Sequence, residues 1–527
     1  MPGESPPSPR QVARPSSCLS HLKGSKLEAT GWSSGYATDR AYTTEFYLEQ
    51  GPEHLNNACV LSGFEPVPLD RPFTYLELGC GQGVTVTLLA AANPHGRFYG
   101  NDFMPAHVVA ADQLISAAQL DNLTVIEDSF EAMAQGKADL PQFDFITMHG
   151  VYTWVSRENR RHIVDIIARY LKPGGIVYVT YNTLPGWAPA RPLHRLLWAQ
   201  SELETGNSEQ RILKARSFVE SLIASGAQFF QNNPGMQLEL DTLRKGNATY
   251  LVHEYLNRNW EPMYHADVAA DFSAAKLDFA GSATLCSSSL RLPEAQQRLL
   301  DGVPDAAWRE TVKNFLLNTR FRKDVFIRGR RPMPPQRRLE WLRQNLLALI
   351  VPREQASFGF EWPEALPPGD SPDAVLDALA EQPRSLETLV GRPLFGGRFP
   401  RLLDDVATVM CDMRRAAMLR PERAGLDNAA ALRLNRAIAL QSRHTDEIQG
   451  LASPLTGHGV PAHLVDRLVY GELVERPGEA VDPAAISARV LGFIQGQGLE
   501  ADDPTVSGMV RQTLATALPM WRQLKMI

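Results

Sequence analysis

The sequence predicts an α/β protein whose main domain is a doubly wound sheet of parallel strands. Short apolar stretches alternate with helix-like stretches between residues 73 and 181. Strands at this spacing need crossover helices, which make neighbouring strands parallel. A glycine-rich turn at 79–83 also stands between the first apolar stretch and the first helix-like one, and this order of strand, turn and helix is typical of a ligand-binding α/β sheet.

The spacing of apolar residues and the residues that start or end helices predict the individual elements. Apolar stretches predict strands at 73–78, 97–102, 123–127, 143–148 and 176–181, and the stretches between them predict helices at 84–92, 105–118 and 157–171. The last helix has the clearest pattern, with apolar residues at helical spacing on one face, namely Ile163, Ile166, Ile167, Tyr170 and Leu171. Ser156 can cap the N-terminus of this helix, and the Pro173-Gly174 pair ends it.

The glycine-rich turn predicts the ligand site. It reads Leu76-Glu77-Leu78-Gly79-Cys80-Gly81-Gln82-Gly83, and Asp102 follows nineteen positions later at the end of the second strand. Glycines let a nucleotide-like ligand approach the backbone, and a carboxylate one strand away can accept two ribose hydroxyls. A tight turn without a ligand is the alternative. The spacing Glu-x-Gly-x-Gly-x-Gly differs from the dinucleotide pattern and resembles the S-adenosylmethionine (SAM) loop of class I methyltransferases, a Rossmann-like fold.

Composition limits the other classes of function. A chain of 527 residues suggests about three domains, and a net charge of −6 gives no basic field to hold nucleic acid. Five cysteines without a Cys-x-x-Cys pair argue against a disulfide framework or a zinc site, so no metal is expected. The sequence shows neither a secretory signal nor an apolar run long enough to cross a membrane. We therefore expect a cytoplasmic protein without a membrane partner.

Composition and period also divide the chain. We expect five parts: a disordered N-terminus at 1–30, the sheet domain at 31–195, a mainly helical regulatory or substrate domain at 196–330, a proline-rich linker at 331–372, and a winged-helix-like module at 373–527. The linker includes an amphipathic helix at 336–350, and the module begins with helices at 373–381, 385–390 and 401–418. The charges of 401–418 are balanced, so we expect a structural or protein-contact role and no DNA binding.

Residues after the fourth and fifth strands are the candidates for catalysis, because the carboxyl ends of parallel strands form the ligand crevice. His149, Tyr152 and Trp154 follow the fourth strand, and Asn182 follows the fifth. Aromatic faces there can enclose the sulfonium methyl group, which is cationic, but the two aromatic residues can equally pack the next helix. His149 could also act as a general base, and Asn182 could cap a turn instead of orienting a nucleophile. His253 and Glu254 lack zinc-type spacing and form either a structural pair or part of the site.

Several segments together resemble one family. They are Gly31-Trp32 with Gly35-Tyr36, the turn described above, Asp128-Ser129-Phe130, His149 to Trp154, Tyr181-Asn182-Thr183-Leu184-Pro185-Gly186-Trp187 and His253-Glu254-Tyr255-Leu256. They are similar to bacterial class I methyltransferases that carry a methyltransferase regulatory domain, among which are protein lysine methyltransferases acting on outer-membrane proteins. The resemblance covers 31–330 well and the C-terminal region loosely.

The resemblance implies SAM as the cofactor and assigns roles to several residues. Glu77, Gly79, Gly81 and Gly83 would hold the amino-acid end of SAM, and Asp102 would accept the ribose hydroxyls. Asp128 in the Asp128-Ser129-Phe130 string would accept from the adenine amino group, with Phe130 or Phe103 covering the ring, and His149 would contact the cofactor. A helix N-cap is the alternative for Asp128.

The function we expect is methyl transfer to lysine side chains of a protein. The alternatives are a small-molecule methyltransferase and a SAM-binding regulator without turnover. A nucleic-acid methyltransferase is less consistent with the sequence, because Asn-Pro-Pro-Tyr is absent after the fourth strand and no Pro-Cys pair is present. The acceptor's identity and the oligomeric state are not determined by the sequence.

Overall fold

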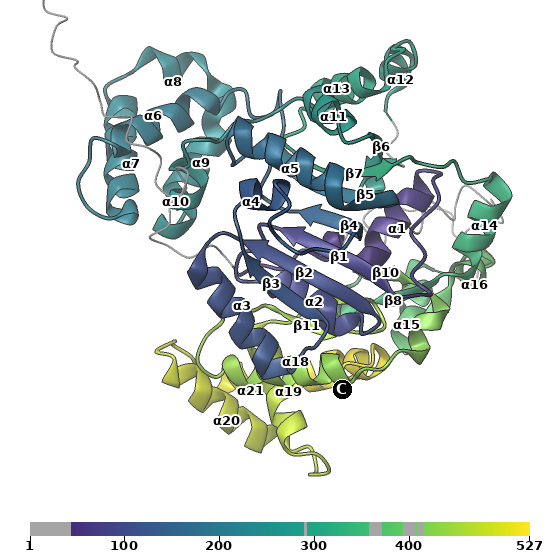
Figure 1. Cartoon of the computed structure of the whole chain (residues 1–527). Helices are drawn as coiled ribbons and strands as arrows, with labels where there is room; N and C mark the ends of the chain where they lie inside the picture. The colour runs from purple at the N-terminus through teal and green to yellow at the C-terminus, as the bar shows by residue number, and fades with distance from the viewer. Residues whose placement is uncertain (1–43, 289–291, 358–370, 394–406, 408–414) are drawn as a thin grey trace, which may run out of the picture.

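The computed structural model describes residues 44–288, 292–357, 371–393, 407 and 415–527. Its centre is a seven-stranded sheet in the order β3-β2-β1-β4-β5-β7-β6 (Figure 1). The strands are β1 (Phe73–Leu78), β2 (Gly96–Asp102), β3 (Leu123–Glu127), β4 (Phe143–Met148), β5 (Leu171–Asn182), β6 (Leu277–Ser282) and β7 (Phe321–Arg328). The first five are parallel, whereas β7 pairs antiparallel with both β5 and β6.

The predicted strands and crossover helices are confirmed. The helices that connect the parallel strands are α2 (Val84–Ala92), α3 (Pro105–Ala118), α4 (Phe130–Ala134) and α5 (Arg157–Tyr170). Ser156 caps α5, because its hydroxyl accepts a hydrogen bond from the backbone N–H of Asn159 at 3.1 Å. Strand β5 starts at Leu171, earlier than the sequence predicts, so α5 ends one residue before its predicted end.

Alternation along the strands produces two hydrophobic layers. Tyr75 and Tyr178 face one layer, together with residues of α2 and of α1 (Pro52–Leu61). Leu76 and Val177 face the other, together with residues of α5 and α11 (His265–Ser273). Because successive strand side chains point to opposite faces, strands buried on both faces need apolar residues at nearly every position. Glu77 is therefore an exception within β1, since it is buried and polar.

Residues 196–330 are mainly helical, as predicted, but they also contribute β6 and β7 to the main sheet, which the sequence analysis did not predict. Helices α6 to α10 gather beside one end of the sheet and α11 to α13 lie beyond β7 (Figure 1). The helices other than α11 are α6 (Arg191–Ser201), α7 (Ser208–Ala224), α8 (Gln228–Asn232), α9 (Gln237–Lys245), α10 (Ala248–Tyr255), α12 (Glu294–Asp301) and α13 (Ala306–Leu317).

The predicted helix at 336–350 is wrong in its second half. Helix α14 (Pro335–Gln344) ends before Asn345, and Leu346–Leu349 form strand β8, which pairs with β9 (Arg384–Ser385) and β10 (Ala416–Leu419). The buried run Leu347 to Leu349 satisfies its backbone through these two neighbours. The predicted helices at 373–381 and 385–390 correspond to α15 (Pro372–Glu381) and α16 (Leu386–Val390).

The winged-helix interpretation of this region stays a prediction. The predicted helix at 401–418 falls largely outside the described residues, and its last positions are wrong, because residues 416–418 belong to strand β10. The expected disordered segment 1–30 and the residues Gly31, Trp32, Gly35 and Tyr36 also lie outside the described residues.

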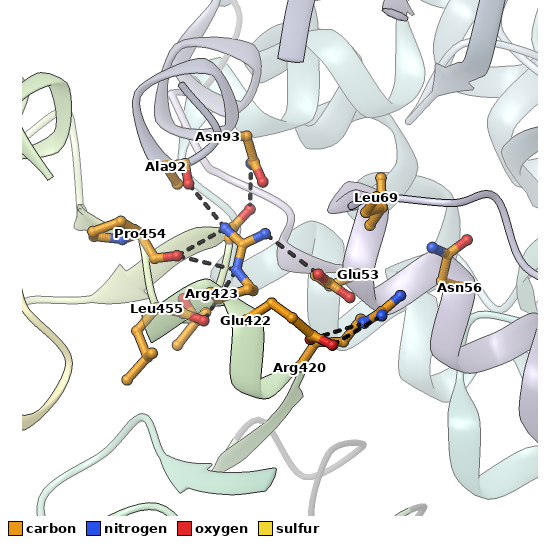
Figure 2. Close-up of polar contacts among 12 residues, drawn as sticks. Glu53, Asn56, Leu69, Ala92, Asn93, Arg420, Glu422, Arg423, Pro454 and Leu455 are labelled. Carbon is orange, nitrogen blue, oxygen red and sulfur yellow. Dashed lines mark hydrogen bonds and ion pairs between the residues drawn. The ribbon is translucent and has the colours of Figure 1, made fainter. Parts of the chain in front are cut away.

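The C-terminal part packs against the sheet domain on the side of α2 and α3 (Figure 1). It consists of α18 (Ala429–Gln441), the hairpin β11 (Gly450–Ser453) and β12 (His458–Pro461), α19 (Leu464–Glu475), α20 (Pro483–Gly496) and α21 (Asp503–Gln523). The buried Arg423 lies at this contact and links it to α1 and α2 (Figure 2). The hairpin thus contacts α2, and α18 contacts both α2 and α3. Helix α2 directly follows the glycine-rich turn.

Candidate functional site

The glycine-rich turn has the backbone that its sequence requires. Gly79, Gly81 and Gly83 have φ values of 67°, 55° and 73°, in the left-handed region where glycine is favoured. A Cβ at Gly79 would lie 2.7 Å from Val151, and one at Gly83 would lie 2.7 Å from Ala111. No atom lies within 4 Å of the position of a Cβ at Gly81. The first and third glycines therefore permit close packing, and the middle one leaves its backbone open.

Asp102 connects this turn to the end of β2. Its Oδ2 accepts the backbone N–H of Gly81 at 2.9 Å, and its Oδ1 accepts the N–H of Met104 at 3.0 Å. Nδ1 of His107 lies 3.2 Å from the same Oδ1. The carboxylate is almost fully buried, yet it lines a cavity at the carboxyl ends of the strands. It can thus hold the turn and still present an acceptor to a ligand.

That cavity has a volume of about 530 Å³ and brings together most of the predicted cofactor residues. They are Gly79, Asp102, Phe103, Asp128, Ser129 and Phe130, and the predicted catalytic residue Trp154 lines the same cavity. Carboxylates that can accept from hydroxyl and amino groups therefore alternate with aromatic faces that can cover a flat ring. This combination suits a nucleoside, because a ribose and a purine need both kinds of contact.

A helix-cap role was the alternative for Asp128, but in the structure the neighbouring Ser129 caps the helix. The hydroxyl of Ser129 accepts the backbone N–H of Ala132 at 3.2 Å and caps α4. The side chain of Asp128 is half-buried and lines the cavity, while its carbonyl accepts Nδ2 of Asn101 at 2.8 Å. The carboxylate of Asp128 is thus left to the cavity, and Ser129 has a structural role at the same place.

Glu77 lies beneath the turn in a dry environment. Nε2 of Gln50 donates to its Oε1 at 2.8 Å, and the backbone N–H of Val86 also donates to the carboxyl. Burial raises the pKa of Glu77 to about 8; the hydrogen bond from Gln50 lowers the pKa, whereas the charge of Asp102 raises it. A cationic group bound nearby would favour the ionised form, so this carboxyl fits the ammonium of an amino acid.

His149 occupies the end of β4 but does not line the 530 Å³ cavity. Its ring stacks on Tyr47, with centroids 3.5 Å apart. Its Nδ1 is 3.0 Å from the hydroxyl of Tyr178. The aromatic ring of Phe321 lies 6.0 Å away. The structure thus places His149 in an aromatic setting next to the cavity, where its role in the reaction stays a prediction.

Two of the predicted catalytic residues lie deeper than the rim. Tyr152 is fully buried, and its hydroxyl donates to Asp271 of α11 at 2.9 Å. The carbonyl of Asn182 accepts the N–H of Met263 at 2.9 Å, and its Nδ2 is buried without a partner among the described residues. Tyr152 therefore packs the interface with the helical region, whereas Asn182 is buried beside Met263 and does not line the 530 Å³ cavity.

A segment from the helical region, residues 257–263, forms a wall that the sequence analysis did not assign. Nδ2 of Asn257 donates to the carbonyl of Trp154 at 3.0 Å, and the N–H of Glu261 donates to the carbonyl of Thr153 at 2.9 Å. Asn259 itself lines the 530 Å³ cavity. His253 and Glu254 lie at the end of α10, just before this segment, and burial raises the pKa of Glu254 to about 7, with Arg320 acting in the opposite direction.

Sequence reasoning missed Gln50, Asn159 and Asn259. Gln50 and Asn259 come from segments far from the turn in the sequence, and polar residues of this kind have no local signal there. The only indication for Asn259 was its position in the same string as His253-Glu254-Tyr255. Asn159 lies in the first turn of α5. The start of this helix is near the carboxyl ends of the strands, so the predicted fold alone could have pointed to this residue.

Larger cavities lie elsewhere. One of about 730 Å³ lies between α3 and α18, and one of about 650 Å³ lies between α5 and α11. Neither combines a glycine-rich turn with acceptors and aromatic faces, so we assign the ligand site by its chemistry. Among the described residues no group of three or more His, Cys, Asp or Glu is placed to hold a metal ion, and no helix is long and apolar enough to cross a membrane.

The fold and this site define a class I methyltransferase. A family model described as a methyltransferase domain matches residues 76–177, and one described as a "predicted methyltransferase regulatory domain" matches residues 247–328. An uncharacterized protein of Synechocystis is 36% identical over 447 residues, which cover 83% of this chain and 87% of that protein. The chain belongs to the family of SAM-dependent class I methyltransferases with a regulatory domain, and SAM is its cofactor.

Other similar proteins agree with this assignment. An uncharacterized protein of Rickettsia prowazekii is 28% identical over 293 residues, which cover 53% of this chain and 50% of that protein. The structure of PKMT2 from Rickettsia typhi in complex with AdoHcy has a TM-score of 0.66 and 19% identity, with 92% of this chain and 99% of that chain covered. At this identity the likeness shows a shared fold over nearly the whole chain.

Proposed function

We propose that this methyltransferase transfers methyl groups to lysine side chains of a protein, and that the lysine enters between the carboxyl ends of the strands and residues 257–263. The proposal rests chiefly on the pair Trp154 and Trp260, whose ring centroids are 6.3 Å apart. Trp154 lines the cofactor cavity, and Trp260 belongs to the regulatory domain. The pair therefore connects the cofactor cavity with an aromatic surface outside it.

This surface, the tryptophan cluster, consists of Trp154, Trp187, His194 and Trp260. The ring of His194 stacks on Trp260 with centroids 4.2 Å apart, and Trp187 meets Trp260 edge to face at 5.3 Å. Aromatic faces attract a methylammonium cation and pack well on the aliphatic stem of lysine. The guanidinium of Arg320 already lies over Trp187, 4.2 Å from its ring centre, which indicates that the cluster accommodates a cation.

Unused hydrogen-bond donors in the same wall favour a peptide as the acceptor. The indole nitrogens of Trp187 and Trp260 and Nδ2 of Asn182 are buried and have no hydrogen-bond partner among the described residues. A buried donor without a partner is costly. A peptide brings backbone carbonyl oxygens that can accept from such donors, whereas a small apolar metabolite cannot.

The chemistry needs alignment and a neutral nucleophile. SAM supplies a methyl group on a sulfonium; the lysine nitrogen uses its lone pair to bond to the methyl carbon as the carbon–sulfur bond breaks and the sulfur keeps the electron pair. Holding the reactants in line contributes several kcal/mol. Lysine has an ordinary pKa near 10.4 and must lose a proton first. The tryptophan cluster excludes water and so disfavours the ammonium form.

PKMT2 is a protein lysine methyltransferase, and it has the same fold over nearly its full length. This similarity supports a protein acceptor. The regulatory domain also provides a wall much larger than a small molecule requires.

The test is methyl transfer from tritium-labelled SAM to proteins of a cell lysate, with Asp102→Ala, which should bind SAM more weakly, as the low-activity control at subsaturating SAM. We expect labelled protein bands, and mass spectrometry of those bands should find methylated lysine. Label confined to carboxylates, arginine, nucleic acid or small molecules would contradict the lysine proposal. Absence of label in every fraction, with SAM bound normally, would support a binding protein without turnover.

A further inference from the structure

We infer that the C-terminal part of the chain is a positioning element for the methyl-transfer site and that it acts through Phe46. The connecting piece is the crossing segment, residues 44–51, which runs from the β11–β12 hairpin to the end of β4. This inference uses the methyltransferase activity of the family and does not depend on lysine as the acceptor.

The β11–β12 hairpin forms a socket for the ring of Phe46. A Cβ at Gly450 would lie 2.6 Å from Cε1 of that ring, and one at Gly459 would lie 2.8 Å from Cε2. Gly459 pairs with Ala452, two residues from Gly450, so both glycines are on the same face of the hairpin. Neither has a positive φ. Their backbone conformations are open to other residues, so the ring is what requires glycine at both positions.

A hydrogen bond strengthens the attachment of the crossing segment to the C-terminal part. The hydroxyl of Thr44 donates to the carbonyl of Glu447 at 2.6 Å, just before β11. The contact joins residues that are 403 positions apart in the sequence. The segment is thus held by the C-terminal part at two consecutive points, Thr44 and Phe46.

Directly after these anchors the crossing segment reaches the site. The ring of Tyr47 stacks on His149, and its backbone N–H donates to Oγ1 of Thr85 in the first turn of α2 at 3.2 Å. Three residues later, Gln50 donates to Glu77 at 2.8 Å. The segment therefore covers Glu77 and contacts the helix that follows the glycine-rich turn. A shift of Phe46 would move both contacts, because Tyr47 is the next residue and Gln50 lies four positions further along the chain.

The hairpin is itself fixed to the sheet domain by Arg423. Its guanidinium donates to the carbonyls of Ala92 at 2.9 Å and Pro454 at 2.8 Å, and it pairs with Glu53 at 3.3 Å (Figure 2). Ala92 is the last residue of α2, and Glu53 is in the first turn of α1. One buried side chain thus holds the hairpin turn in a constant position relative to both helices beside the site.

The test substitutes the socket and measures SAM binding by calorimetry on the full chain. In Gly450→Ala all three nearest neighbours of the new Cβ are atoms of the Phe46 ring, so the ring must move. We expect SAM affinity to fall at least tenfold. Gly492→Ala, in α20 with no atom within 4 Å of the new Cβ, is the matched control and should stay within twofold of the wild type. The double variant Gly450→Ala/Phe46→Leu should recover most of the loss, because leucine vacates part of the socket.

A second readout separates positioning from simple loss of folded protein. Calorimetry at pH 7 in two buffers of different ionisation enthalpy counts the protons released per SAM bound. Displacement of the crossing segment would remove the hydrogen bond from Gln50, and this loss raises the pKa of Glu77, but it would also let water reach the carboxyl. Burial is the larger cause of the shift, so the pKa should fall from about 8, and fewer protons should be released in Gly450→Ala than in the wild type. A smaller folded fraction would leave the count per bound SAM unchanged.

The inference is overturned if Gly450→Ala binds SAM with wild-type affinity. It is equally overturned if the affinity falls but the proton count equals that of the wild type, or if Phe46→Leu fails to suppress the defect. The proposal of a lysine acceptor is unaffected by any of these results, since the readouts involve SAM alone.

Discussion

Tyr47 and His149 stack face to face, with ring centroids 3.5 Å apart and planes inclined by 10°. Tyr47 precedes the first helix of the sheet domain, and His149 directly follows β4. On the other side, Nδ1 of His149 is within hydrogen-bond distance of the hydroxyl of Tyr178. The imidazole is therefore held by both neighbours at the edge of the sheet where the cofactor cavity opens.

The stack predicts unequal effects of two substitutions at Tyr47. Tyr47→Leu removes the aromatic partner of His149, and stacked pairs contribute about 0.5–1.5 kcal/mol beyond their buried area. We expect kcat/KM for labelling of lysate protein to fall up to about tenfold, since about 1.4 kcal/mol corresponds to a factor of ten. Tyr47→Phe should retain nearly full activity because the ring remains. Equal activity of the leucine and phenylalanine variants would show that the stack is irrelevant to the reaction.

Asp102 is predicted to contribute to SAM affinity. Asp102→Ala removes an acceptor for the ribose hydroxyls and the bond to the backbone of Gly81. Loss of a charge-assisted hydrogen bond costs about 1.5–3 kcal/mol, or about ten- to a hundredfold in affinity. Calorimetry with SAM measures the change. Asp112→Ala, an exposed position of α3, is the control and should bind normally; unchanged affinity in a folded Asp102→Ala variant would refute the assignment.

Trp154 is predicted to act on the acceptor side of the cavity. Trp154→Ala removes the ring that connects the cofactor cavity with Trp260, so kcat/KM for the protein acceptor should fall by about tenfold or more, consistent with the loss of a large aromatic contact. SAM affinity should change by less than about threefold, equivalent to below 1 kcal/mol. Trp308→Ala, an exposed residue of α13, is the matched control. A variant that loses SAM affinity and acceptor transfer equally would place Trp154 on the cofactor instead.

Glu77 is predicted to make SAM binding depend on pH. The pKa of Glu77 in the free protein is raised to about 8, chiefly by burial, so its carboxyl holds a proton at pH 7. A bound ammonium group lowers the pKa, and the carboxyl then loses the proton. Gln50, Asp102, Tyr75 and Cys80 surround this carboxyl.

The expected result is release of nearly one proton per SAM at pH 7 and of fewer above pH 8, where the free carboxyl is already ionised. Calorimetry in paired buffers measures it. Glu77→Gln should abolish this release while leaving the shape of the site intact. Release that is identical in Glu77→Gln and the wild type would assign the proton to another group.

Arg423 is predicted to be a major contributor to stability. Removing one partner of a buried ion pair costs about 3–5 kcal/mol, and Arg423→Met also leaves the carbonyls of Ala92 and Pro454 without their donor. Burial raises the pKa of Glu53 despite the nearby Arg423, so the double variant Arg423→Met/Glu53→Met should recover part of the loss. Denaturant unfolding measures it, with Arg420→Met, whose partner Glu422 is exposed, as the control. A loss below about 1 kcal/mol, typical of surface pairs, would contradict the prediction.

The sheet of the cofactor domain was predictable because its signals are local. Each strand from 73 to 182 is bounded by turn residues, and the glycines at 79, 81 and 83 have positive φ values that few other residues adopt. The same locality explains why the sequence pointed to Asp102, Asp128 and Phe130, since Asp102 is the last residue of β2 and the other two come within three residues of the end of β3.

The errors arose where neighbours distant in the sequence override local period. Leu346 to Leu349 have a helical pattern in the sequence, yet they form a strand because β9 and β10 supply hydrogen-bond partners from 384–385 and 416–419. Likewise, β7 lies in a helix-rich region but forms a strand because β5 and β6 pair with it on its two sides.

The sequence by itself determined the class of fold and the glycine-rich turn, because those features depend on spacing along a continuous segment, and the resemblance of its motifs to a known family implied SAM as the cofactor. Only the tertiary structure decided that Gln50 covers Glu77, that Trp260 meets Trp154 and that Phe46 lies in a socket made by Gly450 and Gly459. These contacts join segments up to about four hundred residues apart, and the sequence of one segment does not indicate which other segment it will contact. Their geometry is set by packing, which no local pattern encodes.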